Sequence, residues 1–201
     1  QGKEHSVMTT SKALNGLTPS RIRGGAPNSK ATNEYPIASG LAQNIFTGDI
    51  VVNNAGNIEV LLSTTQKAVG VFMGCQYVAN GEQKFSKYWP SGTSATDAKA
   101  FVVDNPAATF IVQADASVSA GDINSQNFNV TLGSGSTFTG KSGFGLEAGT
   151  RTTGNAMLRA IAVLDEPGND ITVAAERAFP KLEVRIVKHV DAYISADASV
   201  N

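Results

Sequence analysis

Residues 68–78 read AVGVFMGCQYV, and after the turn Ala79-Asn80-Gly81 residues 84–89 read KFSKYW. Valine, phenylalanine and tyrosine are enriched in strands, and the asparagine-glycine pair between the two runs is typical of a turn. The other predicted strands cover residues 42–45, 49–53, 58–62, 100–104, 109–113, 127–132, 157–164 and 181–189. Strands at a spacing of roughly ten residues predict an all-β fold, either an antiparallel barrel or an antiparallel sandwich.

The last predicted strand shows the clearest alternation. Leu182, Val184 and Ile186 share one face, which we expect to be buried. Glu183 and Arg185 share the other face, which we expect to point to solvent. Helical periodicity is weak throughout, and residues 171–178 are the one candidate for a short helix.

The composition indicates a globular protein. Its 201 residues suffice for one β-rich domain or two small ones, and the 41% hydrophobic and 16% charged content fits a folded chain. No stretch approaches the ~20 continuous apolar residues of a membrane-spanning helix. Residues 1–20 contain no apolar core of a signal peptide. Cys75 is the single cysteine, which excludes an intrachain disulfide and fits synthesis in a reducing cytoplasm.

The N-terminal stretch differs from the rest of the chain. Residues 1–34 show no apolar period and are predicted to form an extended arm, with a β-rich body over residues 35–201. Five basic residues against Glu4 give residues 1–30 a net charge of +4, which leaves −5 on the remainder. A basic arm on an acidic body suggests docking on an acidic surface. The residues expected to make that contact are Lys12, Arg21, Arg23 and Lys30. The alternative is a solvated, disordered tail.

Residues 133–154 are rich in glycine, serine and threonine and are predicted to form either a set of loops or a flexible hairpin, which can project from the body. Within them, residues 135–142 match the phosphate-loop pattern G-x-x-x-x-G-K-[ST], and residues 160–165 resemble an apolar strand ending in a Mg²⁺-binding aspartate. A phosphate loop needs a helix to begin at its Lys-Ser pair. Gly143, Gly145, Gly149 and several threonines follow instead, so we reject nucleotide binding.

The other motifs in the sequence give little evidence for a catalytic, metal-binding or nucleic-acid-binding site. His5 and His189 have no ligand partners at metal-binding spacing, and Cys75 within its apolar run is expected to be an inert buried thiol rather than the nucleophile of a Cys75–His189 pair. Residues 165–170 are interpreted as an acidic surface turn rather than a Ca²⁺ site. Residues 21–25 contain one RGG-like element, which by itself does not predict nucleic-acid binding. We therefore predict no catalytic residues, no metal, no cofactor and no enzymatic activity.

Aromatic residues gather in one region of the chain. Tyr77, Phe85, Tyr88 and Trp89 are predicted to form a core cluster or an inter-subunit patch. Stacking of a carbohydrate on Trp89 is the alternative.

Several stretches carry a resemblance to a known family. They are residues 35–40 (YPIASG), 45–49 (IFTGD), 69–77 (VGVFMGCQY), 85–90 (FSKYWP) and the stretch from Leu158 through residues 180–186. Together they resemble capsid decoration, or cement, proteins of marine and cyanobacterial tailed phages, over most of residues 35–190. Residues 85–90 are the most specific part. The resemblance implies binding on the outer shell and no catalysis.

These observations lead to one expectation about function. We expect a structural subunit that binds the outer surface of a tailed-phage head at capsomer junctions and stabilises it. Its partners would be the major capsid protein and further copies of itself, as a homotrimer rather than a homodimer, with neither nucleic acid nor membrane involved. It would be made in the host cytoplasm and end on the virion surface. The alternative is an adhesion module of a head or tail fibre that binds a glycan or receptor.

Overall fold

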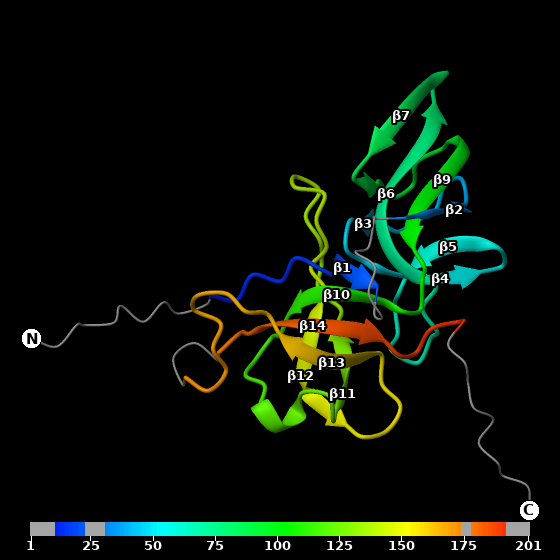
Figure 1. The fold of residues 1–201 in the computed structure, drawn as a ribbon. Coiled ribbons are helices and arrows are strands. Elements are labelled where there is room, and N and C mark those ends of the chain that lie inside the picture. Colours follow the sequence, from blue (N-terminus) through cyan, green and yellow to red (C-terminus); the bar gives the residue numbers. More distant parts are fainter. Residues whose placement is uncertain (1–10, 23–30, 174–177, 192–201) are drawn as a thin grey trace, which may run out of the picture.

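The computed structural model describes residues 11–22, 31–173 and 178–191, which form antiparallel strands arranged in two sheets and one short pair (Figure 1). The first sheet has the order β1-β10-β14-β13-β11-β12, and the second has the order β2-β9-β6-β4-β5 with β7 beside β6. The strands of the first sheet are β1 (Thr18–Ile22), β10 (Ala108–Gln113), β11 (Asn127–Thr131), β12 (Gly145–Thr152), β13 (Leu158–Val163) and β14 (Lys181–Ile186). The others are β2 (Asn33–Pro36), β3 (Ile45–Phe46), β4 (Ile50–Asn54), β5 (Asn57–Val60), β6 (Gly70–Ala79), β7 (Glu82–Ser86), β8 (Tyr88–Trp89) and β9 (Thr96–Val103).

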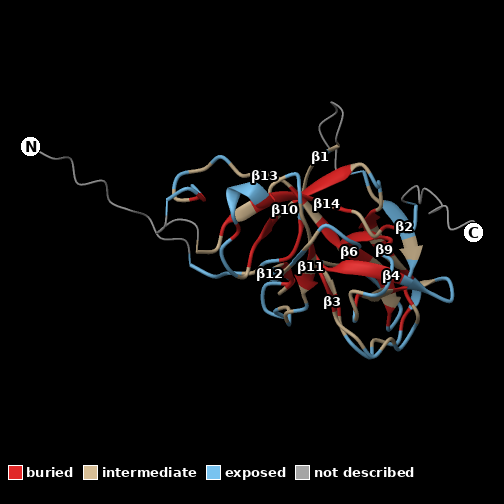
Figure 2. Cartoon of the chain, turned by 90° about the horizontal axis from the view of Figure 1, so that it is seen from below, coloured by how far each residue is buried: buried red, intermediate tan, exposed pale blue. Residues whose placement is uncertain are grey.

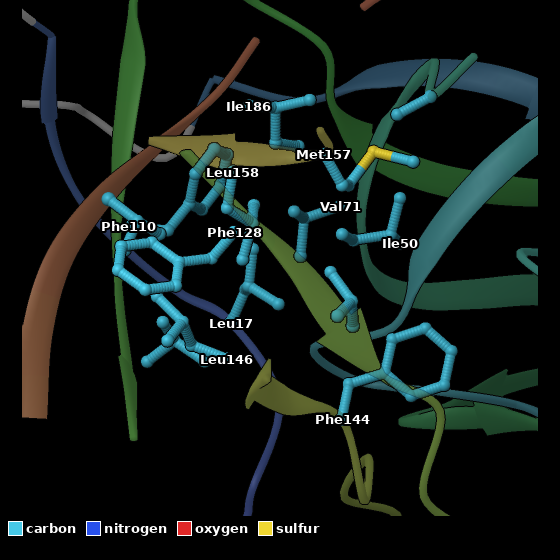
Figure 3. Close-up of a cluster of buried hydrophobic side chains, with 14 of the residues drawn as sticks. Leu17, Ile50, Val71, Phe110, Phe128, Phe144, Leu146, Met157, Leu158 and Ile186 are labelled. Atoms are coloured by element: carbon cyan, nitrogen blue, oxygen red, sulfur yellow. The ribbon is translucent and has the colours of Figure 1, made fainter. Parts of the chain in front are cut away.

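The main hydrophobic core lies between the two sheets. Phe110, Phe128 and Leu158 enter it from the first sheet, and Ile50 and Val71 enter it from the second (Figure 3). Two antiparallel sheets that share one apolar core form a β-sandwich. The predicted all-β, antiparallel fold class is therefore confirmed, in its sandwich form.

A second hydrophobic cluster covers the other face of the second sheet. In β6, Val71 points into the main core while its neighbour Phe72 points into this second cluster. The pair β3-β8 contributes Ile45 and Trp89 to the same cluster. The second sheet is thus buried on both faces around β6, and exposed residues gather at the hairpins and loops (Figure 2).

All ten predicted strands overlap observed ones, with shifted ends. Residues 84–89 are two strands, β7 and β8, because the chain leaves β6 and turns to pair with β3. The prediction of loops over residues 133–154 is wrong for β12, where Leu146 pairs with Val130 and is fully buried. Burial and backbone pairing there offset the cost of glycine in a strand. Residues 171–173 form a turn rather than the start of a helix, and residues 174–177 lie outside the described part.

The prediction of an extended arm over residues 1–34 is wrong for residues 11–22 and for β2. β1 pairs with β10, and β2 pairs with β9, so both are edge strands of the body. Leu17 is 1% exposed within the main core. Gly16 packs so closely that a Cβ atom there would lie 2.4 Å from the Cβ of Ser142, and its φ of +76° favours glycine. Only Leu17 among the apolar side chains of residues 11–22 is fully buried, so no period is visible in the sequence of this segment.

Candidate functional site

The glycine-rich residues 135–141 form a tight hairpin, here called the Phe138 hairpin. Its two sides are joined by hydrogen bonds from the Ser136 amide to the Lys141 carbonyl (2.9 Å) and from the Gly140 amide to the Ser136 carbonyl (2.7 Å). In Figure 1 it is the narrow yellow-green loop that stands out from the body. Phe138 lies at its tip and is 97% exposed.

The base of the Phe138 hairpin is fastened to the chain between β3 and β4. Thr47 donates from its amide to the Gly140 carbonyl and accepts from the Ser142 amide, both at 3.0 Å. On the other side, a Cβ atom on Gly135 would lie 2.2 Å from the ring of Phe46, so only glycine allows this approach. The hairpin is therefore held in one position on the body before any partner binds.

Beside the hairpin lies an open groove of about 680 Å³, lined by apolar side chains together with polar ones such as Gln43 and Asn44. Leu62 and Leu132 line it and are 61% and 42% exposed. They share this hollow with the exposed Phe138. The lining residues are Gln43, Asn44, Phe46, Asp49, Val60, Leu61, Leu62, Leu132, Gly133, Ser134, Gly135, Ser136, Thr137, Phe138 and Phe144. Exposed apolar side chains that gather around a hollow are typical of a surface that binds another molecule.

The floor of the groove contains a buried carboxyl group, that of Asp49. It accepts a hydrogen bond from the Phe46 amide at 2.7 Å. Burial raises the pKa of Asp49 to about 6, and hydrogen bonds from the Ser142 hydroxyl and the Phe46 amide lower it in part. Asp49 is the one ionisable residue among those lining the groove in the described part of the chain, which favours an apolar, uncharged ligand.

The geometry of residues 135–142 agrees with the rejection of nucleotide binding. After Lys141 the chain continues into β12, a strand, so no helix presents free amides at this point. The amides of Ser136, Gly140 and Ser142 already donate to backbone carbonyls. A phosphate would have to displace these bonds.

The four predicted aromatic residues do not form one patch. Tyr77 and Trp89 are buried in the second cluster and meet edge to face, with ring centroids 5.2 Å apart. Tyr88 stacks on Phe46 with a centroid distance of 5.5 Å. Phe85 stands alone on β7 and is 71% exposed. Since Trp89 is fully buried, it offers no stacking platform to a carbohydrate.

The four basic residues that were predicted to contact an acidic surface do not share one environment. Lys12 is exposed. Arg21 is not free for a partner, because it binds Glu183 of the same chain with both ion-pair contacts at 2.7 Å. Arg23 and Lys30 lie outside the described residues. Glu183 is 7% exposed, so the expectation that it points to solvent is wrong. Arg21, on the edge strand β1, reaches across β10 to this carboxylate on β14.

The remaining candidates are structural. Cys75 is buried, and burial raises the pKa of its thiol to about 12, while its Sγ donates to the Tyr88 carbonyl. Burial lowers the pKa of His189, whose Nδ1 accepts the Asp191 amide. In the turn of residues 165–170, Asn169 holds the backbone of Leu164 and Lys181. Across the described ranges, no group of three or more His, Cys, Asp or Glu residues could hold a metal ion.

Comparisons of the chain with protein-family models, with curated proteins and with solved structures give no match. No helix among the described residues is long and apolar enough to cross a membrane. A projecting hairpin within residues 133–154 was one of the two predicted forms, but the groove and the exposure of Phe138 were missed in the sequence. Their one signal is a lone phenylalanine within a run of glycine, serine and threonine, where nothing nearby in the sequence could bury it.

Proposed function

We propose that this protein is a structural decoration, or cement, subunit that binds the outer surface of a tailed-phage head and stabilises it. The observation that supports this best is the hairpin of β6 and β7, which reaches beyond the rest of the body (Figure 1) and carries the exposed Phe85. An exposed aromatic side chain on a projecting hairpin is suited to contact with another protein.

The edge of the sheet adds a second means of contact. Among the described strands β7 pairs only with β6, and its first four residues, Glu82 to Phe85, are all exposed. Such an edge can accept a further strand from a neighbouring protein through its backbone groups. Glu82 and Lys84 on the same strand discourage indiscriminate pairing and favour a partner with matching charges.

The binding free energy of one such contact is small, as expected for a subunit that binds a repeated lattice. Burial of a phenylalanine contributes about 1.5–3 kcal/mol. That is weak for an isolated complex, but a shell offers many identical sites, and an oligomer that engages several of them at once binds far more tightly than a single copy. The proposed partners are thus the major capsid protein and further copies of this chain.

The structure changes the role first expected for the N-terminal segment. Since Arg21 is paired with Glu183 and Leu17 lies in the core, residues 11–22 stabilise the body rather than cross to a neighbouring subunit. We therefore assign the shell contact to β7 and not to Arg21. Lys12, which is exposed, stays compatible with a contact to an acidic surface.

The test is binding to purified heads that lack the protein. We expect Phe85→Ser to weaken binding by about tenfold or more, which corresponds to loss of one buried aromatic side chain. Val173→Ser is the matched control, because Val173 is also an exposed apolar residue but lies in the turn of residues 171–173 rather than on β7. Equal binding of the Phe85→Ser variant and the wild type would remove β7 from the contact.

Copy number separates this proposal from the adhesion alternative. A decoration subunit should be present in hundreds of copies in each purified virion, since it follows the capsid lattice. A head-fibre or tail-fibre module should be present in a few to tens of copies. Quantitative mass spectrometry against the major capsid protein measures the ratio, and a low ratio would contradict the decoration role.

A further inference from the structure

We infer that the groove lined by Leu62 and Leu132 receives Phe138 from a second copy of this chain. This surface is distinct from β7, so the inference stands apart from the proposed shell contact. It concerns how copies of the protein bind one another.

The donor side of this contact is preformed. The Phe138 hairpin is closed by its own backbone bonds and fastened to Thr47, so its tip needs no ordering when it binds. Little conformational entropy is lost when a rigid element of this kind enters a pocket. Although Phe138 lies at the rim of its own groove, it is 97% exposed, so this groove does not bury it.

The receiving side matches the donor in chemistry. The tip residues Thr137, Phe138 and Thr139 carry no charge, and neither do the side chains that line the groove, with the exception of the buried Asp49. The groove is an open hollow of about 680 Å³, which can receive a protruding side chain. It is therefore large enough for a phenylalanine ring with part of its hairpin.

The small area of a single contact favours a reciprocal arrangement. Stable complexes bury about 800 Å² on each partner, whereas a typical apolar patch of a monomer covers roughly 300–600 Å². One phenylalanine entering one groove falls short of this area. Because hairpin and groove are neighbours on one surface, each copy can donate Phe138 and receive Phe138 in the same assembly, which adds the flanks of both hairpins to the contact.

The experiment is sedimentation velocity over a range of concentrations on four samples. They are the wild type, Phe138→Ser, which removes the donor, Leu62→Asp, which places a charge in the groove, and an equimolar mixture of the two variants. We expect the wild type to associate, and we expect the dissociation constant of self-association to be at least about tenfold higher for each variant alone. Circular dichroism and thermal unfolding confirm that both variants are folded, as expected for two exposed side chains.

The mixture is the decisive sample. The Leu62→Asp copy keeps its Phe138, and the Phe138→Ser copy keeps Leu62, Leu132 and the floor of its groove and loses one side chain at the rim, so the two can form one contact that neither variant forms by itself. Association of the mixture above that of either variant supports the inference. A wild type that stays monomeric, variants that associate like the wild type, or a mixture no stronger than its components would each overturn it.

The shell contact is tested separately. If Phe138→Ser leaves the mass of the protein in solution unchanged but reduces binding to heads, the hairpin contacts the shell and the inference of self-association is wrong. If Phe85→Ser has no effect on head binding while the mixture associates, the proposed shell contact fails and the self-association stands.

Discussion

Arg21 and Glu183 form a two-pronged ion pair, in which the arginine Nε and Nη2 atoms each lie 2.7 Å from a different carboxylate oxygen of Glu183. The hydroxyl of Thr109 donates to the same carboxylate at 2.7 Å. These contacts join β1, at the start of the described chain, to β14, at its end, across the intervening strand β10. Residues that appeared to be a separate arm are thus tied into the first sheet.

The ion pair predicts a dependence of stability on pH. The hydrogen bond from Arg21 is the largest cause that lowers the pKa of Glu183, so the pair stabilises the fold above the ordinary glutamate pKa and this contribution is lost as pH falls through the lowered value. We expect Arg21→Gln to unfold at a lower temperature than the wild type at pH 7, and the difference to shrink towards pH 3. Lys12→Gln, in the same segment but exposed, should have no such effect.

The buried carboxyl group of Asp49 predicts the opposite dependence of stability on pH. Its pKa is raised from 3.8 to about 6, so its ionisation in the folded state opposes folding as pH rises through this interval. The cost at neutral pH is about 3 kcal/mol at most. Asp49→Asn keeps an acceptor for the Phe46 amide, and we expect its free energy of unfolding to gain on the wild type between pH 4 and pH 7. Urea unfolding at several pH values measures the difference, and parallel curves for the two proteins would refute it.

Leu17 predicts that the N-terminal segment is part of the folded body. It is fully buried among residues of both sheets, and Leu17→Ala removes that packing (Figure 3). We expect the free energy of unfolding to fall by about 2–5 kcal/mol. Chemical denaturation measures it, with Lys12→Ala as the control in the same segment. A fall of less than about 0.5 kcal/mol, the usual range for surface positions, would show that the segment does not pack there.

The hairpin at residues 135–142 predicts an absence of nucleotide binding despite its phosphate-loop pattern. The amides of Ser136 and Gly140 are used within the hairpin, and that of Ser142 is used in its attachment to Thr47. We expect no saturable binding of labelled ATP with Mg²⁺ in equilibrium dialysis. Saturable binding that is lost in Lys141→Ala would contradict this assignment.

Short-range patterns in the sequence were sufficient to predict most strands and the antiparallel class. A strand such as β6 contains enough valine and aromatic residues in ten positions to mark it, and turn residues mark its end. Patterns of this kind failed for β1, β2 and β12, because a short edge strand with no buried side chain, or a strand rich in glycine, owes its structure to the neighbour it pairs with.

The sequence by itself therefore determined most of the strands, where most turns fall and that the chain folds as an antiparallel β protein. Only the tertiary structure decided which of several similar residues are buried. Trp89 is inside while Phe85 and Phe138 are exposed, and Glu183 is covered because Arg21, distant in the chain, lies over it. The physical reason is that strand formation depends on neighbouring residues, whereas burial and ion pairing depend on segments that meet only after the two sheets have packed together.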